Sequence, residues 1–205
     1  MAKSAHVGSS LSVVEVLVSA YLHSTSISET SDVFLSKGHA AAALYAVLAE
    51  LGYIPKSLLS TYCTDGSLLS GHASHAGIRG VPLSTGSLGH ALPVATGVAY
   101  INRLQESSDQ TVVVLSDGEC DEGSNWEAAL FAGHHKLANL KVIIDRNGLQ
   151  SISQTETTLE LEPLADKWRA FGWHVEFCPG HDVELLLEKL GRAIDGTPRP
   201  TVIIA

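Results

Sequence analysis

Apolar residues recur at helical spacing through most of the first half of the chain. Positions three and four apart predict two amphipathic helices, over residues 11–21 and 44–51. A third helix is predicted over 90–104, where Ala, Gly and Val allow close packing. Between the second and third of these helices, residues 64–89 show no periodicity and are rich in Gly, Ser, His and Pro. Because connections of this length in compact domains are usually functional, we expect a site in this loop.

The second half of the chain alternates short apolar runs with helical patterns. The runs that predict strands are 112–115, 142–144, 175–177 and 202–204. The patterns that predict helices are 126–137, 164–171 and 183–190. Uninterrupted apolar strands separated by helices indicate a parallel sheet that is covered on both faces. The predicted fold class is therefore α/β, a parallel sheet flanked by helices on both faces, with residues 1–205 forming a single domain.

Composition and charge narrow the class of protein. The 205 residues are 45% hydrophobic and 17% charged, as in globular proteins, and the mean hydropathy of +0.16 favours a partner that covers apolar surface. Thirteen Lys and Arg against 22 Asp and Glu give a net charge of −9, which disfavours nucleic acid and anionic membranes as partners. We expect neither a signal peptide nor a membrane span. Three scattered cysteines suit a reducing compartment, so the expected location is cytoplasmic.

Polar residues follow two of the predicted strands, at the edge where parallel sheets bind ligands. Ser116-Asp117-Gly118 follows the first strand, and Asp145-Arg146-Asn147 follows the second. Because one helix joins these strands, Asp117 and Asn147 are expected to meet and to offer a carboxylate and an amide oxygen to Mg²⁺. Gly118 would let backbone amides approach a phosphate. Each segment alone is also an ordinary turn, and only the pair together favours a site.

The Asp117-Gly118 pair followed by Asn147 resembles the thiamine diphosphate motif, and the resemblance extends along the chain to the N-terminal, diphosphate-binding half of transketolases. Four further segments resemble transketolase motifs in the same order: Ala5-His6-Val7-Gly8, Leu35-Ser36-Lys37-Gly38-His39, Gly71-His72 and Thr85-Gly86-Ser87-Leu88-Gly89. One position departs from the family pattern. Ser116 stands where the motif begins with glycine, while Asp117 and Gly118 remain.

The resemblance implies a cofactor and a metal at named positions. The residues that resemble contacts of thiamine diphosphate are His39, Gly86, Leu88, Asp117, Gly118 and Asn147. The resemblance also implies Mg²⁺, or Ca²⁺ or Mn²⁺ in its place. Asp117, Asn147 and the backbone carbonyl of Leu149 resemble its protein ligands.

Three further residues resemble catalytic ones. His6 and His72 resemble histidines that hydrogen-bond sugar hydroxyls and move protons during carbon–carbon bond cleavage. Glu122 resembles an interface glutamate that is coupled to the catalytic glutamate of a partner. His6 and His72 could also have no catalytic role, because a histidine in a glycine-rich loop is often a surface residue. Glu122 could also do no more than favour the start of its helix.

The implied reaction transfers a two-carbon ketol unit from a ketose or ketose phosphate to an aldose acceptor. The pyrimidine-binding and C-terminal domains of transketolases have no counterpart among the 205 residues. The resemblance therefore implies a split enzyme that is completed by a pyrimidine-domain subunit, with a homodimer of this chain inside a heterotetramer. A face bearing Trp126 and Phe131, together with residues 89–100, is expected to offer apolar surface to such partners. A piece of a longer chain is the alternative.

Other functions remain as alternatives at this point. One is a related thiamine diphosphate subunit that acts on a 2-oxo acid or in a specialised sugar or natural-product pathway, and another is a non-catalytic scaffold. The sequence contains no Gly-x-Gly-x-x-Gly, Walker A or Gly-x-Ser-x-Gly motif, which disfavours dinucleotide, nucleotide triphosphate and serine-hydrolase sites. Zinc at His72 and His75 lacks supporting ligands. Cys120, between acidic neighbours, is not expected to be a nucleophile.

Overall fold

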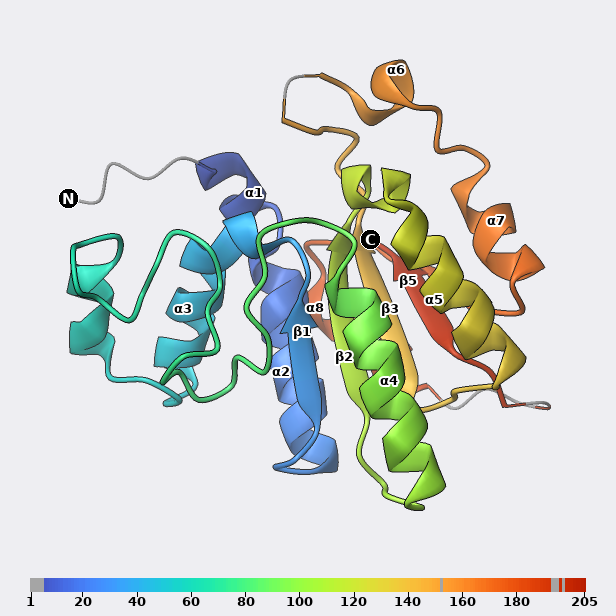
Figure 1. The fold of residues 1–205 in the computed structure, drawn as a ribbon, viewed down its shortest axis with the longest axis horizontal. Coiled ribbons are helices and arrows are strands. Elements are labelled where there is room, and N and C mark those ends of the chain that lie inside the picture. Colours follow the sequence, from blue (N-terminus) through green and yellow to red (C-terminus); the bar gives the residue numbers. More distant parts are fainter. Residues whose placement is uncertain (1–5, 152, 193–195, 197) are drawn as a thin grey trace.

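A five-stranded parallel sheet forms the centre of the computed structural model, which describes residues 6–151, 153–192, 196 and 198–205 (Figure 1). The strands are β1 (Asp32–Leu35), β2 (Thr111–Ser116), β3 (Leu140–Asp145), β4 (His174–Phe177) and β5 (Thr201–Ile204). Their order in the sheet is β1-β2-β3-β5-β4, and every neighbouring pair is parallel. The predicted fold class is confirmed. Only β1 had no counterpart among the predicted strands.

Helices and short 3-10 turns connect the strands. The helices are α1 (Val7–Leu11), α2 (Val14–Ile27), α3 (Ala41–Glu50), α4 (Ala91–Leu104), α5 (Gly123–His134), α6 (Thr155–Thr158), α7 (Leu164–Ala170) and α8 (Val183–Gly191). The 3-10 turns are η1 (Gly38–Ala40), η2 (Lys56–Thr61) and η3 (Gly118–Asp121). Within the described ranges, no helix is long and apolar enough to cross a bilayer.

Two predicted helices differ from the observed ones. The pattern over 11–21 covers two helices, α1 and α2, and the break between them falls at Ser12 and Val13. Ser12 donates its hydroxyl to the Asp145 carboxylate at 2.7 Å, a tertiary contact that periodicity cannot show. The pattern over 126–137 is also too long, because α5 ends at His134 and Leu137 is buried beyond the helix.

Helices cover both faces of the sheet, as Figure 1 shows. Every residue of β2 and β3 is buried, and successive side chains enter opposite layers. On one face, strand residues pack with α2, α3 and α8: Val33, Leu35, Val112, Val114, Ile143 and Ile203. On the other face, strand residues pack with α4, α5 and α7: Phe34, Val113, Leu115, Val142, Ile144, Val202 and Ile204. Burial on both faces explains why these strands are continuous apolar runs.

The long polar segment crosses the carboxyl end of the sheet. No helix or strand occurs from residue 62 to residue 90, a range that the structure describes throughout, which confirms the predicted loop. Thr85 fixes the segment to the sheet, because its hydroxyl donates to the carbonyl of Leu35 in β1 at 2.8 Å. Its backbone N–H donates to the carbonyl of Ala73 at 3.0 Å, within the segment itself. Figure 1 shows this green segment passing over the end of the sheet where β1 and β2 finish. The loop therefore lies where a ligand of a parallel sheet binds.

Candidate functional site

The turns that follow β2 and β3 meet at the carboxyl edge of the sheet. Ser116 and Asp145 are register partners at the ends of these strands. Asp117 is completely buried, and its Oδ1 accepts the backbone N–H of Gly118 at 2.8 Å. Its Oδ2 accepts the backbone N–H of Gly148 at 2.7 Å and Nη1 of Arg146 at 3.0 Å. The predicted meeting of the two segments is observed, and the Asp117 carboxylate is held by groups from both.

Asn147 and Leu149 lie in the tight turn after β3. Gly148 has a φ of +77°, a conformation that glycine adopts without strain. The Oδ1 of Asn147 accepts the backbone N–H of Leu149 at 2.9 Å, and its Nδ2 donates to the hydroxyl of Ser12 at 3.1 Å. The Leu149 side chain is exposed. This turn presents an amide oxygen and a backbone carbonyl close in sequence to the groups that hold Asp117.

The donor chemistry of these two turns fits a hard cation. Asp117, Asn147 and Leu149 would offer carboxylate, amide and carbonyl oxygens, the ligands that Mg²⁺ and Ca²⁺ prefer. Among the described residues, no group of three His, Cys, Asp or Glu side chains is placed to hold a metal. A zinc site at His72 and His75 gains no support from this arrangement. An ion at the sheet edge would therefore depend on amide and backbone oxygens beside one carboxylate.

A buried ion pair lies beside these turns. Nζ of Lys37 is 2.5 Å from Oδ2 of Asp145, and the two side chains are 1% and 7% exposed. Lys37 follows β1 and Asp145 ends β3, so the pair joins two strand ends that are separated by β2. Breaking such a pair leaves an uncompensated buried charge, which is costly. The pair fixes the backbone that leads into Gly38 and His39.

Three predicted histidine positions come together although they are far apart in sequence. The ring centroids of His6 and His39 are 5.3 Å apart, and those of His6 and His72 are 6.0 Å apart. A Cβ built on Gly86 would lie 3.7 Å from the His72 ring, so this glycine belongs to the same cluster. Ala5, which precedes His6 in its motif, lies outside the described residues. The structure thus brings four of the predicted site residues together from four segments.

Burial sets the charge of one of these histidines. The pKa of His39 is lowered to about 4, chiefly by desolvation, and the positive charge of Lys37 and the neighbouring His6 and His72 act in the same direction. His39 is therefore neutral at physiological pH. A neutral imidazole keeps one N–H, which can donate a hydrogen bond to a phosphate oxygen.

Close packing places the Thr85–Gly89 turn between the strand ends. A Cβ on Gly38 would lie 2.4 Å from the carbonyl oxygen of Thr85, so the two backbones touch at a distance that only glycine allows. Gly89 has a φ of +80°, and a Cβ there would lie 2.7 Å from Cβ of Glu122. The side chain of Leu88 is half-buried in this turn. The turn therefore contacts both the Lys37-Gly38-His39 segment and the start of α5.

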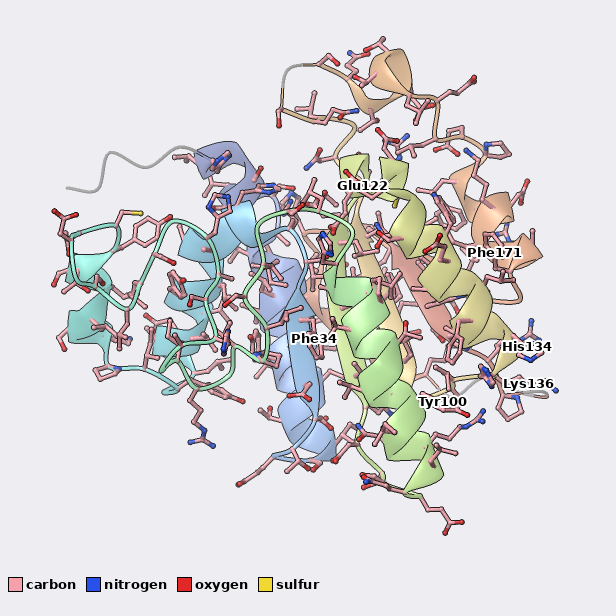
Figure 2. All side chains as sticks on the ribbon, in the orientation of Figure 1. Phe34, Tyr100, Glu122, His134, Lys136 and Phe171 are labelled. Carbon is pink, nitrogen blue, oxygen red and sulfur yellow. The ribbon has the colours of Figure 1, made fainter. Side chains whose placement is uncertain are left out.

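Glu122 and Cys120 occupy opposite environments in η3 and at its end. Glu122 is exposed and precedes α5 without making a side-chain capping hydrogen bond, and Figure 2 shows it at the end of α5 nearest the carboxyl edge of the sheet. Cys120 is buried, and its burial together with the charges of Glu119 and Asp117 raises the pKa of its thiol far above the usual value. A neutral buried thiol is not a nucleophile, in agreement with the sequence prediction.

Four charged residues of the site were not among the predicted ones: Lys37, Glu119, Asp145 and Arg146. Each lies within two positions of a predicted residue, and charged side chains are ordinarily on the surface. The signal that could have found them is position, because three of them follow or end a buried strand. At such positions, a charge must be paired to be buried.

The architecture has a counterpart among solved structures. The crystal structure of the transketolase from Campylobacter jejuni superimposes with a TM-score of 0.79 at 22% sequence identity, over 96% of this chain and 37% of that chain. This likeness defines the fold as that of a transketolase domain. The family model for the transketolase thiamine diphosphate binding domain matches residues 1–205, and the chain belongs to this family.

Two relatives are named as subunits of transketolases, and the chain covers three quarters of the length of each. One belongs to the apulose-4-phosphate transketolase of Actinobacillus succinogenes; the identity is 42% over 207 residues, covering 98% of this chain and 75% of that protein. Another belongs to a 6-deoxy-6-sulfo-D-fructose transketolase of a Clostridium species; the identity is 38% over 206 residues, covering 97% of this chain and 75% of that protein. Each of these relatives is named as one subunit of its enzyme. These comparisons confirm the resemblance found in the sequence.

Proposed function

We propose that this chain is the diphosphate-binding subunit of a two-component transketolase. It would transfer a two-carbon ketol unit from a ketose or ketose phosphate to an aldose acceptor, with thiamine diphosphate and Mg²⁺, and residues 1–205 would form its single cofactor-binding domain. The observation that carries this proposal is the meeting of Asp117 and the Asn147 turn at the same sheet edge as the histidine cluster. Membership of the thiamine diphosphate binding domain family supports it.

The proposed cofactor site uses oxygen donors, backbone amides and neutral imidazole. Asp117, Asn147 and the Leu149 carbonyl would bind the metal, whose positive charge would offset the negative charge of the diphosphate. Gly118 and His39 would contact the diphosphate. Bound thiamine diphosphate supplies the electron sink that makes cleavage of a carbon–carbon bond in a ketose feasible.

The Thr85–Gly89 turn and the remaining histidines would face the reacting atoms. Gly86 and Leu88 would contact the aminopyrimidine and thiazolium rings from this chain's side. His6 and His72 would hydrogen-bond substrate hydroxyls and hold or release a proton as the bond between two carbons breaks and re-forms. The 6.0 Å between their ring centroids supports a role for both histidines at one substrate.

The proposed partner is a pyrimidine-domain subunit. Relatives that match nearly the whole chain are named as subunits of transketolases, which supports a partner for this chain as well. Exposed apolar side chains on α4 and α5 offer a surface for it: Val94, Ile101, Leu104, Leu130 and Phe131. Glu122, which is exposed at the start of α5, would meet the partner's glutamate. Two pairs would form a heterotetramer around a homodimer of this chain.

One part of the predicted partner surface is half-buried. Trp126 was expected on an exposed face with Phe131, but it packs on α7, with ring centroids 5.3 Å from Trp168 and 6.0 Å from Phe171. Its indole N–H also donates to the carbonyl of Cys120 at 2.8 Å. The pattern along α5 could not show that α7 returns to cover this side chain. Phe131 remains exposed.

The donor is proposed only as a class. The relatives from Actinobacillus and Clostridium are named for different ketoses, so family membership does not select one. We propose a cytoplasmic location, which the three free cysteines support.

Reconstitution tests the proposed function. The chain is co-expressed with a candidate pyrimidine-domain subunit, and two-carbon transfer is assayed from a panel of ketoses and ketose phosphates, with thiamine diphosphate and Mg²⁺. We expect turnover that needs both chains and both cofactors. Turnover with the chain alone would contradict the two-component proposal. Transfer from a 2-oxo acid but from no ketose would favour the related enzyme class instead.

A further inference from the structure

Three segments of the candidate site converge on one side chain that none of the proposed roles uses. Glu119, in η3, is completely buried. Its Oε1 accepts the hydroxyl of Ser36, which follows β1, and the backbone N–H of Gly89 at 2.8 Å. Its Oε2 accepts the backbone N–H of Ser116 at 3.4 Å. One carboxylate thus joins the ends of β1 and β2 to the turn that carries Gly86 and Leu88.

The backbone of Glu119 is held as firmly as its side chain. Nδ2 of Asn125, a buried residue of α5, donates to the Glu119 carbonyl at 2.7 Å. The Oγ of Ser116 accepts the Glu119 N–H at 3.3 Å. Because the Glu119 carboxylate in turn accepts the Ser116 N–H, the two residues form a reciprocal Ser-x-x-Glu pair, the arrangement of a capping box.

This pair gives Ser116 a role. Ser116 stands where the family motif begins with glycine, and it ends β2 in extended backbone that does not require glycine. Its hydroxyl supplies an acceptor that glycine lacks, directed at the first turn of η3. The departure from the motif is therefore compatible with the Asp117-Gly118 turn and adds a hydrogen bond that orients it.

From these contacts we infer that Glu119 is a positioning residue. It fixes the Thr85–Gly89 turn against the Asp117-Gly118 turn, and the Ser116 hydroxyl fixes Glu119. Among the described residues between Thr85 and the start of α4, Gly89 is the one whose backbone N–H donates to a side chain of another segment. The inference rests on the proposed function for its ligand, because the two turns are those proposed to hold thiamine diphosphate from either side.

A buried carboxylate can also contribute only to the stability of the fold. Two substitutions at Glu119 separate this role from the positioning role. Glu119→Gln keeps an Oε1 that can accept from Ser36 and Gly89 and loses only the acceptor for Ser116. Glu119→Met fills a similar volume without any acceptor. The two variants therefore differ in the tie to Gly89 far more than in packing.

The test compares amide hydrogen exchange at Gly89 with exchange at Ile143, a core residue of β3. Glu119→Met leaves the Gly89 N–H without its side-chain acceptor, so we expect it to speed exchange at Gly89 by roughly 10- to 100-fold relative to Ile143. Glu119→Gln retains a neutral acceptor, so its effect is about fivefold or less. Glu127→Met, a substitution on α5 away from these contacts, is the matched control and should leave both amides unchanged.

Calorimetric titration with thiamine diphosphate and Mg²⁺ is the second arm, run with the proposed partner present. We expect Glu119→Met to lower affinity about tenfold or more and Glu119→Gln to restore most of it. If Glu119→Met changes exchange at Gly89 and at Ile143 by the same factor, or speeds exchange at Gly89 while affinity stays parental, the positioning role is overturned. If the parent itself binds no thiamine diphosphate, the proposed function fails, and the exchange data still decide whether Glu119 holds the turn.

Discussion

Nη1 of Arg146 lies 3.0 Å from Oδ2 of Asp117, and this contact connects the candidate metal ligand to a segment outside the sheet. The same guanidinium donates to Glu156 at 2.6 Å and to Glu162 at 3.2 Å, residues that lie in α6 and before α7. It also donates to the hydroxyl of Thr155 at 2.8 Å. Asp117 is therefore oriented by a cation whose other partners hold the 153–163 segment against the site.

Replacing Arg146 with Met should loosen both ends of this network. Asp117 would keep its two backbone donors and lose its charged one, so we expect a loss of roughly 1.5–3 kcal/mol in the free energy of unfolding. The 153–163 segment should also become sensitive to proteolysis. Denaturant unfolding and limited proteolysis measure the two effects.

The matched control is Lys56→Met, which removes an exposed ion pair with Glu50. Exposed pairs of this kind contribute about 0–1 kcal/mol, so this variant should unfold like the parent. If Arg146→Met resists protease as the parent does, the guanidinium does not hold the segment.

A second prediction concerns the metal. Asp117→Asn keeps the shape of the side chain and removes the charge that would balance a cation against diphosphate. We expect affinity for thiamine diphosphate with Mg²⁺ to fall by about 100-fold or more in calorimetric titrations with the partner present. Asp166→Asn, on the exposed side of α7, should bind as the parent does. An Asp117→Asn variant with parental affinity would remove Asp117 from the metal site.

Substitutions of His39 and His72 should impair different steps, cofactor binding and turnover. His39 is expected to contact the diphosphate, so His39→Ala should weaken cofactor binding by about tenfold. His72 is expected to act on substrate, so His72→Ala should lower turnover by about 100-fold while cofactor affinity changes little. Cofactor titration and steady-state kinetics of each variant separate these effects. The reverse pattern would exchange their roles.

The pKa of His39 gives a prediction about pH. Burial lowers this pKa to about 4, so the folded chain favours the neutral ring, and the resulting stability is present above the ordinary value near 6.5. As pH falls from about 6.5 toward 4, the unfolded chain takes up the proton first and this stability is lost. Unfolding followed between pH 7 and 4 should show a shallower decline in His39→Gln than in the parent.

An anionic ligand should move the same pKa upward. A diphosphate beside His39 favours the charged ring, so binding of thiamine diphosphate should raise the pKa and take up protons near pH 5. Calorimetry in buffers of different ionisation enthalpy measures this uptake. No uptake at pH 5, with binding intact, would mean that the diphosphate does not contact His39.

The sheet was predictable because its central strands are buried on both faces, so each of them contains an uninterrupted apolar run in the sequence. The meeting of Asp117 with the Asn147 turn was predictable for a similar reason, since the ends of neighbouring parallel strands share one edge. The paired charges were not predictable. Lys37 and Asp145 are 108 positions apart, and only the placement of β1 beside β2 brings them within 2.5 Å. The partial burial of Trp126 could not be predicted for the same reason, because the side chain that covers it belongs to α7.

The last prediction concerns assembly. Exposed apolar side chains gather on α4 and α5, where Tyr100 and Phe131 also meet at 5.5 Å between ring centroids. Figure 2 shows Tyr100 on α4 beside the end of α5 that carries His134. Exposed apolar surface of this kind costs free energy in water until a partner covers it. The isolated chain should therefore self-associate and have no ketol transfer activity until the pyrimidine-domain subunit is added.

Light scattering and a transfer assay on the chain alone, then with the partner, measure both expectations. Phe131→Glu places a charge on the apolar surface of α5 and should weaken binding of the partner by about tenfold or more, since burying an unpaired carboxylate is costly. Leu159→Glu, an exposed position after α6, is the control for the added charge. A monodisperse monomer with full transfer activity would refute the split enzyme, because its site would then be complete within this one chain.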